Sequence, residues 1–404
     1  MSQTNGHSPS LGTLILPNAQ PDLGRALEEA IEISARRGAP LTSVVTQANP
    51  DLLPASNAKT PVPHPSELPA HMLEGVRQID IMKSLAPLSP AMKDVEREIE
   101  RLITTPVKLV ADIAGHVLGA GGKRLRPALT LLSAQLCGDD EDEPAARAVT
   151  CAALVELTHT TTLLHDDVVD GATMRRGKPA ANLVWGNETS VLVGDYLFAQ
   201  VFVTASKRGI AELMHPLAHA TAQMCAGELL ETQMRGYWEM SERQYLDIVA
   251  LKTGSLTECS CRMGALSVNG SEAQVEALGT FGRSIGVAFQ IVDDVFDVML
   301  NAEQIGKPVG NDLREGAITL PMLWTLENSP HKDEFRALLE IEEKSDDNVN
   351  RAIEIMREGE GAQSSMQMAR SFVEAAKDVL GDFPDCAAKS MMYDIADYVL
   401  ARKK

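Results

Sequence analysis

The sequence predicts an all-α protein. Aromatic residues make up only 4% of the 404 residues, whereas apolar residues make up 44%, and runs of β-branched residues are few. From about Ser89 onward apolar residues recur with a period of 3.6, and the alternation typical of strands is essentially absent. These observations indicate ten or more helices in one domain that spans residues 89–404.

The first 88 residues have a different composition. Twelve of the 21 prolines fall within residues 1–90, so residues 1–88 are expected to form a largely extended or disordered leader. One short amphipathic helix is expected at residues 22–38, where an aspartate cap precedes apolar residues at helical spacing and a glycine follows them.

Turn signals divide the helical domain into successive helices. Glycine, proline and clustered polar residues mark breaks at 119–122, 138–144, 171–186, 207–209, near 236, around 270, at 306–316 and at 327–334. The acidic stretch GDDEDEP at 138–144 is interpreted as a solvated loop that places acids at the next helix N-terminus. No internal repeat of fixed period is found.

Charge and composition exclude several functional classes. The net charge of −19 argues against nucleic-acid binding, which needs a basic surface. The six cysteines form no disulfide framework and no zinc-site spacing. No apolar run reaches the roughly 18 residues of a membrane span, and the N-terminus resembles neither a signal nor a transit peptide. A cytoplasmic protein with reduced thiols is therefore expected.

Two groups of three aspartates carry the strongest functional signal. They share the spacing DDxxD and are 127 residues apart: Asp166, Asp167 and Asp170, and Asp293, Asp294 and Asp297. Residues i and i+4 lie on one face of a helix, so each group projects its carboxylates toward a common point. Like charges held this close disfavour joint ionisation, and a divalent cation removes the conflict.

The type of ligand indicates which cation would bind to these aspartates. Carboxylate oxygens without histidine or cysteine ligands favour Mg²⁺ or Mn²⁺ over zinc. A single DDxxD is weak evidence, because solvated helix faces produce it by chance. Two such groups that each follow an apolar helical segment, TTLL and GVAFQIV, make a chance origin improbable.

Cationic residues lie near both aspartate groups in the sequence. They are Lys123, Arg124, Arg126, Arg175, Arg176, Lys252 and Lys307. Guanidinium and ammonium groups bind phosphate oxygens, while a metal ion binds the remaining ones. The combination of metal-binding carboxylates and cations predicts a diphosphate substrate.

These segments resemble the all-trans isoprenyl diphosphate synthases, which are head-to-tail prenyltransferases. The resemblance covers residues 89–404 and includes GGKRLRP, HTTTLLHDDVVD, MRRGKPAAN, SVLVGDYLF, KTG, GVAFQIVDDVFD, GKPVGNDLREG and TLP, in this order. It implies the isoprenoid synthase fold, in which helices surround a central cavity, and a homodimer. The match is closest to octaprenyl and decaprenyl synthases, which make quinone side chains.

The resemblance also implies roles for individual residues. The six aspartates would hold three Mg²⁺ ions on an allylic diphosphate such as farnesyl diphosphate, with Mn²⁺ as an alternative. The residues that would bind this diphosphate directly are Arg175, Lys252, Thr253, Gln290 and Lys307, and Lys252 is also expected to act in catalysis. The residues that would bind isopentenyl diphosphate are Gly122, Lys123, Arg126, His159, Arg176 and Phe289. His165 is interpreted as structural.

One position departs from the family pattern. The family usually carries a lysine directly after the Arg-Glu-Gly turn, and this chain has Ala317 there. The allylic diphosphate would therefore lose one cation. Weaker allylic binding, or compensation by Lys307 or Arg314, is the expected consequence.

Product length is expected to be set upstream of Asp166. Thr158, Thr161 and Thr162 would form the floor of the tunnel that accepts the growing chain. A helical turn and a five-carbon unit are both about 5 Å long, so each small floor residue would admit about one more unit. The resemblance to octaprenyl and decaprenyl synthases implies a long product of about C40 to C50. Three aromatic residues on the next helix are candidates to close the tunnel further down: Tyr196, Phe198 and Phe202.

Four alternatives remain at this point. A shorter-chain farnesyl or geranylgeranyl diphosphate synthase would share all the motifs. A non-catalytic regulatory subunit is suggested by Ala317 and the leader. A terpene cyclase would normally lack the second aspartate group, and an HD-type phosphohydrolase would need further histidine ligands. Release of a long product would involve transient membrane contact, although no transmembrane segment is expected.

Overall fold

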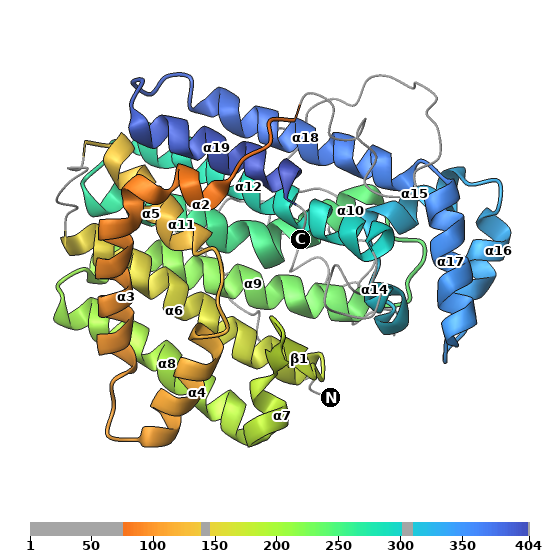
Figure 1. The fold of residues 1–404 in the computed structure, drawn as a ribbon, viewed down its shortest axis with the longest axis horizontal. Coiled ribbons are helices and arrows are strands. Elements are labelled where there is room, and N and C mark those ends of the chain that lie inside the picture. The colour runs from red at the N-terminus through yellow and green to blue at the C-terminus, as the bar shows by residue number, and fades with distance from the viewer. Residues whose placement is uncertain (1–75, 139–145, 301–309, 403–404) are drawn as a thin grey trace, which may run out of the picture. The chain divides into compact units, whose positions relative to one another are not determined.

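The computed structural model describes residues 76–138, 146–300 and 310–402. The sheet structure in these ranges is one two-stranded antiparallel hairpin, β1 (Met174–Arg175) and β2 (Lys178–Pro179), which the sequence did not indicate. The prediction of an all-α fold with ten or more helices is confirmed (Figure 1). The helix expected at residues 22–38 lies outside the described residues.

The helices differ widely in length. The long ones are α3 (Ser89–Ile103), α4 (Lys108–Leu118), α5 (Leu125–Leu136), α6 (Ala146–Val169), α8 (Asn187–Lys207), α9 (Met214–Met234), α11 (Ser255–Ser267), α12 (Glu272–Met299), α17 (Asp346–Glu358), α18 (Gly361–Val379) and α19 (Ala387–Ala401). The short ones are α2 (Ile81–Ser84), α7 (Ala181–Trp185), α10 (Glu242–Val249), α14 (Asn311–Glu315), α15 (Leu320–Asn328) and α16 (Lys332–Leu339). Two 3₁₀ turns and a π-helical turn complete the set: Ala86–Leu88, Ala211–Leu213 and Ala250–Gly254.

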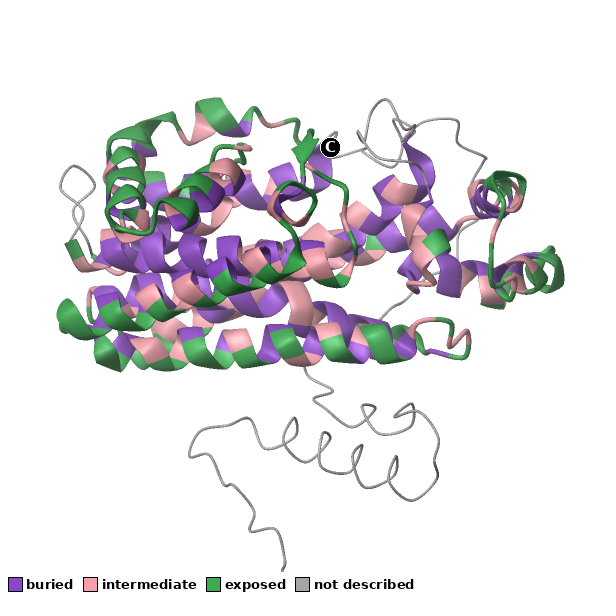
Figure 2. Cartoon of the chain, turned by 90° about the horizontal axis from the view of Figure 1, so that it is seen from below, coloured by how far each residue is buried: buried purple, intermediate pink, exposed green. Residues whose placement is uncertain are grey.

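α6 and α11 form the centre of the bundle. α11 packs against α5, α6, α9 and α12, and α12 in turn packs against α18 and α19. Residues 151–158 of α6 are all buried, as Figure 2 shows for the central helices. A helix segment that is buried around its whole circumference must lie inside a bundle, and residues 151–158 of α6, which span two turns, satisfy this condition.

Local sequence determines where α10 and α12 begin. Ser241 accepts a hydrogen bond from the backbone N–H of Gln244, whose side chain accepts one from the backbone N–H of Ser241. Ser271 and Gln274 make the same reciprocal pair at the start of α12. Each pair satisfies two N–H groups that a helix N-terminus leaves without partners.

The folded part of the chain begins before residue 89. Ile81 and Leu88 are buried, and α2 packs against α19. Arg77 donates a hydrogen bond to Asp394 of α19 at 2.9 Å, and Ser84 donates another to the same carboxylate. Residues 81–88, which the sequence analysis assigned to the leader, are therefore attached to the helical body.

α8 is the described helix with the length and mean hydropathy, 1.2, of a membrane span. Val193, Leu197 and Val201 are buried in the core, and α8 packs along α6. Leu192 and Phe202, on its other faces, are exposed. One such helix is weak evidence for a membrane protein, and its packing is that of a bundle helix with one uncovered apolar face.

We expect Gly264→Ala on α11 to destabilise the protein. A Cβ atom at this position would lie 2.1 Å from the carbonyl oxygen of Thr130 on α5, so the two helices would have to separate. Overpacking of this kind lowers the free energy of unfolding by about 1–3 kcal/mol, which urea denaturation measures.

Gly115→Ala on α4 is the matched control, because a Cβ atom there meets nothing within 4 Å. It should stabilise the protein by about 0.5–1 kcal/mol through helix propensity. Equal stability of the two variants would contradict the close contact of α5 and α11.

Candidate active site

The first aspartate group lies at the C-terminal end of α6. Asp166 and Asp167 belong to its last turn, and Asp170 follows the helix directly. Gly171 has a φ of +59°, a conformation that commonly terminates helices and suits glycine. The chain then enters the β1–β2 hairpin, and Arg175 returns to donate from its Nε to Asp167 at 2.7 Å.

Asp294, in the second group, is held by neutral donors near the C-terminal end of α12. The hydroxyl of Tyr245 donates to one carboxylate oxygen at 2.6 Å, and the amide of Gln290 donates to the other at 2.9 Å. Thr253 donates to Gln290 at 3.0 Å. Three elements, α10, α12 and the π-helical turn, are thus joined at this carboxylate.

The other two aspartates of α12 have different partners. Asp293 pairs with Arg402, which follows the last helix, α19. Asp297 accepts long hydrogen bonds of 3.4 Å from the backbone N–H groups of Asn311 and Asp312 at the start of α14. The second group is therefore covered by two segments that are remote from it in sequence.

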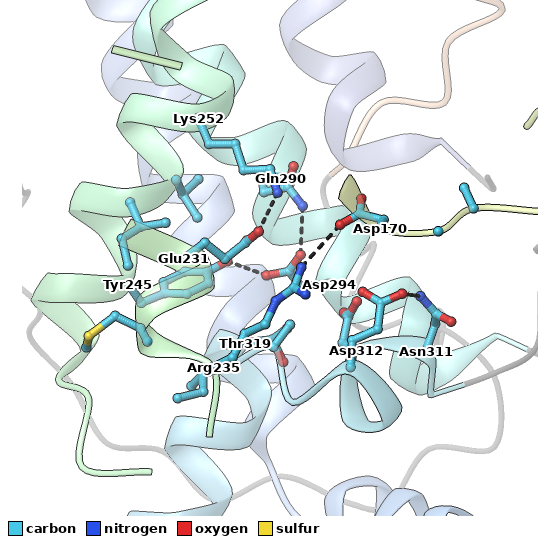
Figure 3. A pocket seen from close by; sticks show the side chains of 18 of the residues that line it. Asp170, Glu231, Arg235, Tyr245, Lys252, Gln290, Asp294, Asn311, Asp312 and Thr319 are labelled. Atoms are coloured by element: carbon cyan, nitrogen blue, oxygen red, sulfur yellow. Dashed lines mark hydrogen bonds and ion pairs between the residues drawn. The ribbon is translucent and has the colours of Figure 1, made fainter. Parts of the chain in front are cut away.

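A cavity of about 480 Å³ lies between these helix ends. Five of the predicted site residues line it: Asp170, Arg175, Lys252, Gln290 and Asp294. The cavity also contains residues that the sequence analysis did not select, namely Glu231, Arg235, Tyr245 and Asp312. Figure 3 shows their side chains around the same space, with Asp170 and Asp294 both reached by hydrogen bonds or ion pairs.

Lys252 enters the cavity from the π-helical turn Ala250–Gly254. π-Turns interrupt a helix and are frequent at functional sites. Gly227 of α9 makes room for this one, because a Cβ atom there would lie 2.6 Å from the backbone nitrogen of Lys252. The ammonium group pairs with Glu228 at 2.8 Å and also with Glu231.

The cavity carboxyl groups resist ionisation. Burial, followed by repulsion from Glu228, raises the pKa of Asp166 from 3.8 to about 7. Burial also raises the pKa of Asp294 to about 7, against the opposing effect of the hydrogen bonds from Tyr245 and Gln290. Burial and the neighbouring Asp297 raise the pKa of Asp312 well above its ordinary value. A cation added to this cavity would be bound favourably.

A second set of predicted residues gathers around His159 on α6. Burial, and then the charges of Arg126 and Arg176, hold the pKa of His159 well below its ordinary value, so the imidazole is neutral at pH 7. The Nε of Arg126 is buried without a hydrogen-bond partner among the described residues. Several cations around one unsatisfied donor are the pattern expected of an anion site.

The backbone of this cationic set is strained. Arg124 and Arg176 have φ values of 50° and 51°, in the left-handed region that residues other than glycine rarely adopt. Gly122 makes room for Arg176, because a Cβ atom would lie 2.8 Å from its guanidinium. Lys123 lies 5.1 Å from the ring centre of Tyr398 on α19.

Phe289 lies beneath the C-terminal segment. The guanidinium of Arg402 is 3.7 Å from the centre of its ring, and Arg402 also donates to the backbone carbonyl of Phe289. Arg402 is 4% exposed, so it closes over both Phe289 and Asp293. The sequence offered no signal for this contact, because Arg402 lies 109 residues after Asp293.

The three threonines lie on two adjacent turns of α6, Thr158 on one and the neighbouring Thr161 and Thr162 on the next. Thr158 and Thr161 are buried and Thr162 is half-buried. Thr161 and Thr162 donate to backbone carbonyls of their own helix, at 3.1 Å and 2.9 Å. The hydroxyl of Thr158 is buried without a partner among the described residues. None of the three lines the 480 Å³ cavity.

The aromatic residues of α8 do not lie together in the core. Phe202 is 44% exposed and packs edge-to-face on Phe198. Tyr196 donates to Thr105 at 2.9 Å. The sequence-based expectation that Phe202 closes a tunnel deep in the protein is therefore wrong, because its ring lies at the surface of this chain.

Two residues were expected to compensate for Ala317. Lys307 lies outside the described residues. Arg314 donates at 2.7 Å to Asp346, whose side chain is 84% exposed, so its charge is directed to the surface. Ala317 itself lines the cavity. The expected compensation by Arg314 is not seen.

The described residues contain no group of three Asp, Glu, His or Cys side chains that already converges on an ion position. The aspartates are instead engaged by cations and hydrogen-bond donors. Their chemistry nevertheless fits a hard divalent ion, because all are carboxylates and the pKa values of Asp166 and Asp294 show unrelieved repulsion or desolvation. Such an ion would replace Arg175 and Arg402 as partners of the aspartates.

Known proteins match both the sequence and this geometry. A family model described as polyprenyl synthetase matches residues 107–356. The chain is 35% identical over 340 residues to the nonaprenyl diphosphate synthase of Mycobacterium tuberculosis, which covers 83% of this chain and 98% of that protein. A short chain isoprenyl diphosphate synthase of Methanothermobacter thermautotrophicus is 33% identical and covers 80% and 99%.

Solved structures of polyprenyl synthases also match the fold of this chain. A polyprenyl synthase from Caulobacter crescentus, complexed with calcium and isoprenyl diphosphate, superposes with a TM-score of 0.77 at 34% identity and covers 81% of this chain and 99% of its own. A decaprenyl diphosphate synthase from Rhodobacter capsulatus gives 0.75 at 34% identity, with 80% and 99% covered. The chain belongs to the polyprenyl synthetase family.

The raised pKa values predict a pH dependence of stability in metal-free protein. Below about pH 4 Asp166 is protonated in both states; between about pH 4 and 7 it ionises in the unfolded state first. The unfolded state then binds fewer protons at this group, so the contribution of Asp166 to the free energy of unfolding falls as pH rises through this range and levels off above it. Melting in a chelator measures this contribution by comparison with a variant that lacks the carboxyl group.

Asp166→Asn should make the decline shallower and should raise the melting temperature at pH 8, because no buried charge then forms. Asp112→Asn, at an exposed site on α4, is the control. Identical pH profiles for wild type and Asp166→Asn would show that Asp166 ionises as easily in the folded state as in the unfolded state.

Proposed function

We propose that this protein joins an allylic diphosphate to isopentenyl diphosphate, head to tail and repeatedly, to make an all-trans polyprenyl diphosphate. The observation that carries the proposal is the meeting of one aspartate from each group, Asp170 after α6 and Asp294 on α12, in one cavity whose wall also contains Arg175 and Lys252. Membership of the polyprenyl synthetase family supports the same reaction.

The proposed cofactor is Mg²⁺, as three ions on the six aspartates, with Mn²⁺ as an alternative. A divalent ion bound here supplies positive charge to the departing diphosphate and so eases rupture of the allylic carbon–oxygen bond. The calcium in the Caulobacter structure supports a divalent-ion site in this family. Oxygen ligands of this kind also suit Mg²⁺.

The chain's own cations would bind the allylic diphosphate directly. Arg175 has a guanidinium fork beside Asp167, and Lys252 is a point charge on the opposite wall. Thr253 and Gln290 hydrogen-bond each other at 3.0 Å and would turn to the substrate together. Lys307 remains a proposed ligand outside the described residues. These groups hold the leaving diphosphate while the carbon–oxygen bond breaks.

Isopentenyl diphosphate would bind beside His159. Lys123, Arg126 and Arg176 provide the cations and the neutral imidazole a further hydrogen bond, while Gly122 leaves room for Arg176. Phe289 would provide an apolar face near the reacting double bond once Arg402 moves away from its ring. Separating this metal-free site from the aspartates lets two diphosphates bind at once without sharing the same cations.

We propose a long product of about C40 to C50, the length of a quinone side chain, on the resemblance to octaprenyl and decaprenyl synthases. Thr158, Thr161 and Thr162 leave small side chains along α6, and relatives named nonaprenyl and decaprenyl synthases support the same length. A shorter product is the second candidate, because the short-chain relative is nearly as similar. Both aspartate groups are present, which argues against a non-catalytic subunit.

A homodimer in the cytoplasm, with transient membrane contact during product release, completes the proposal. Some of the exposed apolar residues support it, because they lie on two helices that pack against each other. Leu183 and Val184 lie on α7, and Leu192, Phe202 and Val203 lie on α8, which packs against α7. A second copy of the chain would cover this face.

An assay with farnesyl diphosphate, radiolabelled isopentenyl diphosphate and Mg²⁺ tests the proposed reaction. The expected result is a ladder of labelled products that ends near C40 to C50, the range to which the relatives named nonaprenyl and decaprenyl synthases belong. Chelation of Mg²⁺ should abolish it. Absence of any labelled product from the full-length chain with Mg²⁺ would refute the proposal.

Thr161→Tyr should shorten the product by several units, because the ring would fill the space beside α6 through which the chain grows. Thr162→Phe should act likewise. Thr150→Val, on the same helix but three turns further from Asp166, is the control for stability. Products of wild-type length from both floor variants would place the tunnel elsewhere.

A further inference from the structure

The cavity wall has a cation beside Ala317. The backbone N–H of Gly236 donates to the carbonyl oxygen of Gly316 at 3.0 Å, so the residues on either side of this hydrogen bond are neighbours in space. Arg235 precedes Gly236 and Ala317 follows Gly316, and both line the cavity. The segment that ends α9 thus places a guanidinium where the Arg-Glu-Gly turn provides only a methyl group.

The end of α9 directs Arg235 into the cavity. The helix stops at Met234, and Arg235 adopts an extended conformation, with φ −53° and ψ 125°. Its Nη2 donates to Asp170 at 3.1 Å, and Figure 3 shows the side chain extending toward this carboxylate. Both side chains are 27% exposed, so the pair is reached by solvent or ligand.

The guanidinium of Arg235 has one N–H group that no acceptor among the described residues reaches. Its Nε is buried and lacks a hydrogen-bond partner among the described residues. A buried N–H without an acceptor is unfavourable, and such groups call for an explanation. An anion in the cavity would provide the missing acceptor, because the Nε and Nη groups of arginine donate in parallel to two oxygens.

The other two cavity cations are more fully engaged. Arg175 donates to Asp167 from both Nε and Nη2, and Lys252 is shared between Glu228 and Glu231. Within the described ranges Arg235 pairs with one carboxylate, that of Asp170, which is itself a proposed metal ligand. A metal ion on Asp170 would weaken that pair and leave the guanidinium for the substrate.

We propose that Arg235 binds the allylic diphosphate and supplies the positive charge that Ala317 does not. The inference deepens the proposed function and rests on it. It also explains a small residue at 317, since a lysine there would place a second cation against Arg235. The positive charge of the site is thereby kept, but Arg235 at the end of α9 provides it instead of a residue in the turn before α15.

Four variants test this assignment: Arg235→Ala, Arg235→Lys, Ala317→Lys and the double variant Arg235→Ala/Ala317→Lys. KM for farnesyl diphosphate, KM for isopentenyl diphosphate and kcat are measured separately. Arg235→Ala should raise the allylic KM about tenfold or more, the usual effect of losing a charge-assisted contact, and should leave the isopentenyl KM within about twofold. Arg235→Lys should lose less, and the double variant should recover most of the loss.

Arg314→Ala is the matched control, because Arg314 is only three residues from Ala317 but pairs with the exposed Asp346. It should leave all three kinetic constants unchanged. An unchanged allylic KM in Arg235→Ala, equal rises in both KM values, or a double variant no better than Arg235→Ala would each overturn the assignment.

Binding of farnesyl thiodiphosphate, measured by calorimetry with Mg²⁺, separates this inference from the proposed function. If wild type binds the analogue but makes no product from farnesyl diphosphate and isopentenyl diphosphate, the proposed reaction is refuted. The effect of Arg235 on binding is still measured in that case. Weaker binding by Arg235→Ala, by about tenfold, supports the role; equal binding removes it.

Discussion

The site depends on the compensation of carboxylates that gather at two helix ends, of which Asp170 and Asp294 line one cavity. Both aspartate groups lie at the C-terminal ends of helices, α6 and α12, where the helix dipole adds negative partial charge. Carboxylates in such a place cost free energy unless a cation or a hydrogen-bond donor faces them. Asp167 faces Arg175, Asp293 faces Arg402, and Asp294 accepts from Tyr245. Because these carboxylates need a cation, the cavity would also attract divalent ions and, with them, a diphosphate.

The helical scaffold keeps these charges in place. Close contacts through glycine hold α11 against α5 and α12: a Cβ atom on Gly264 or Gly282 would meet a backbone carbonyl oxygen at 2.1 Å or 2.5 Å. Gly227 brings α9 against the π-helical turn that carries Lys252. The backbone positions of the site are therefore fixed by packing, while the side chains that exchange partners lie at helix ends and in the hairpin. Fixed helices whose terminal side chains can change partners suit a site that must admit and release charged ligands.

The fold and the aspartate groups could be predicted because they depend on local periodicity. A repeat of 3.6 residues defines the helices, and DDxxD places carboxylates on one face wherever the helix goes. Arg235 and Arg402 could not be predicted in this way, since each follows the last residue of a helix, where no periodic pattern applies.

The partners of the cations also differ from the prediction, for a physical reason. The sequence analysis matched the cations to diphosphates, and in the structure Arg124, Arg175 and Lys252 pair with carboxylates. Arg314 shows the limit of proximity in sequence: it lies beside Ala317 in the chain, but its side chain reaches Asp346 instead.

The central claim is that the carboxylates bind a diphosphate through divalent ions. Calorimetric titration of the full-length protein with farnesyl thiodiphosphate, with Mg²⁺ and with a chelator, tests it most directly. The account predicts binding that requires Mg²⁺ and that Asp166→Asn and Asp294→Asn each weaken strongly. Equal affinity in the chelator, or wild-type affinity in both variants, would contradict the account.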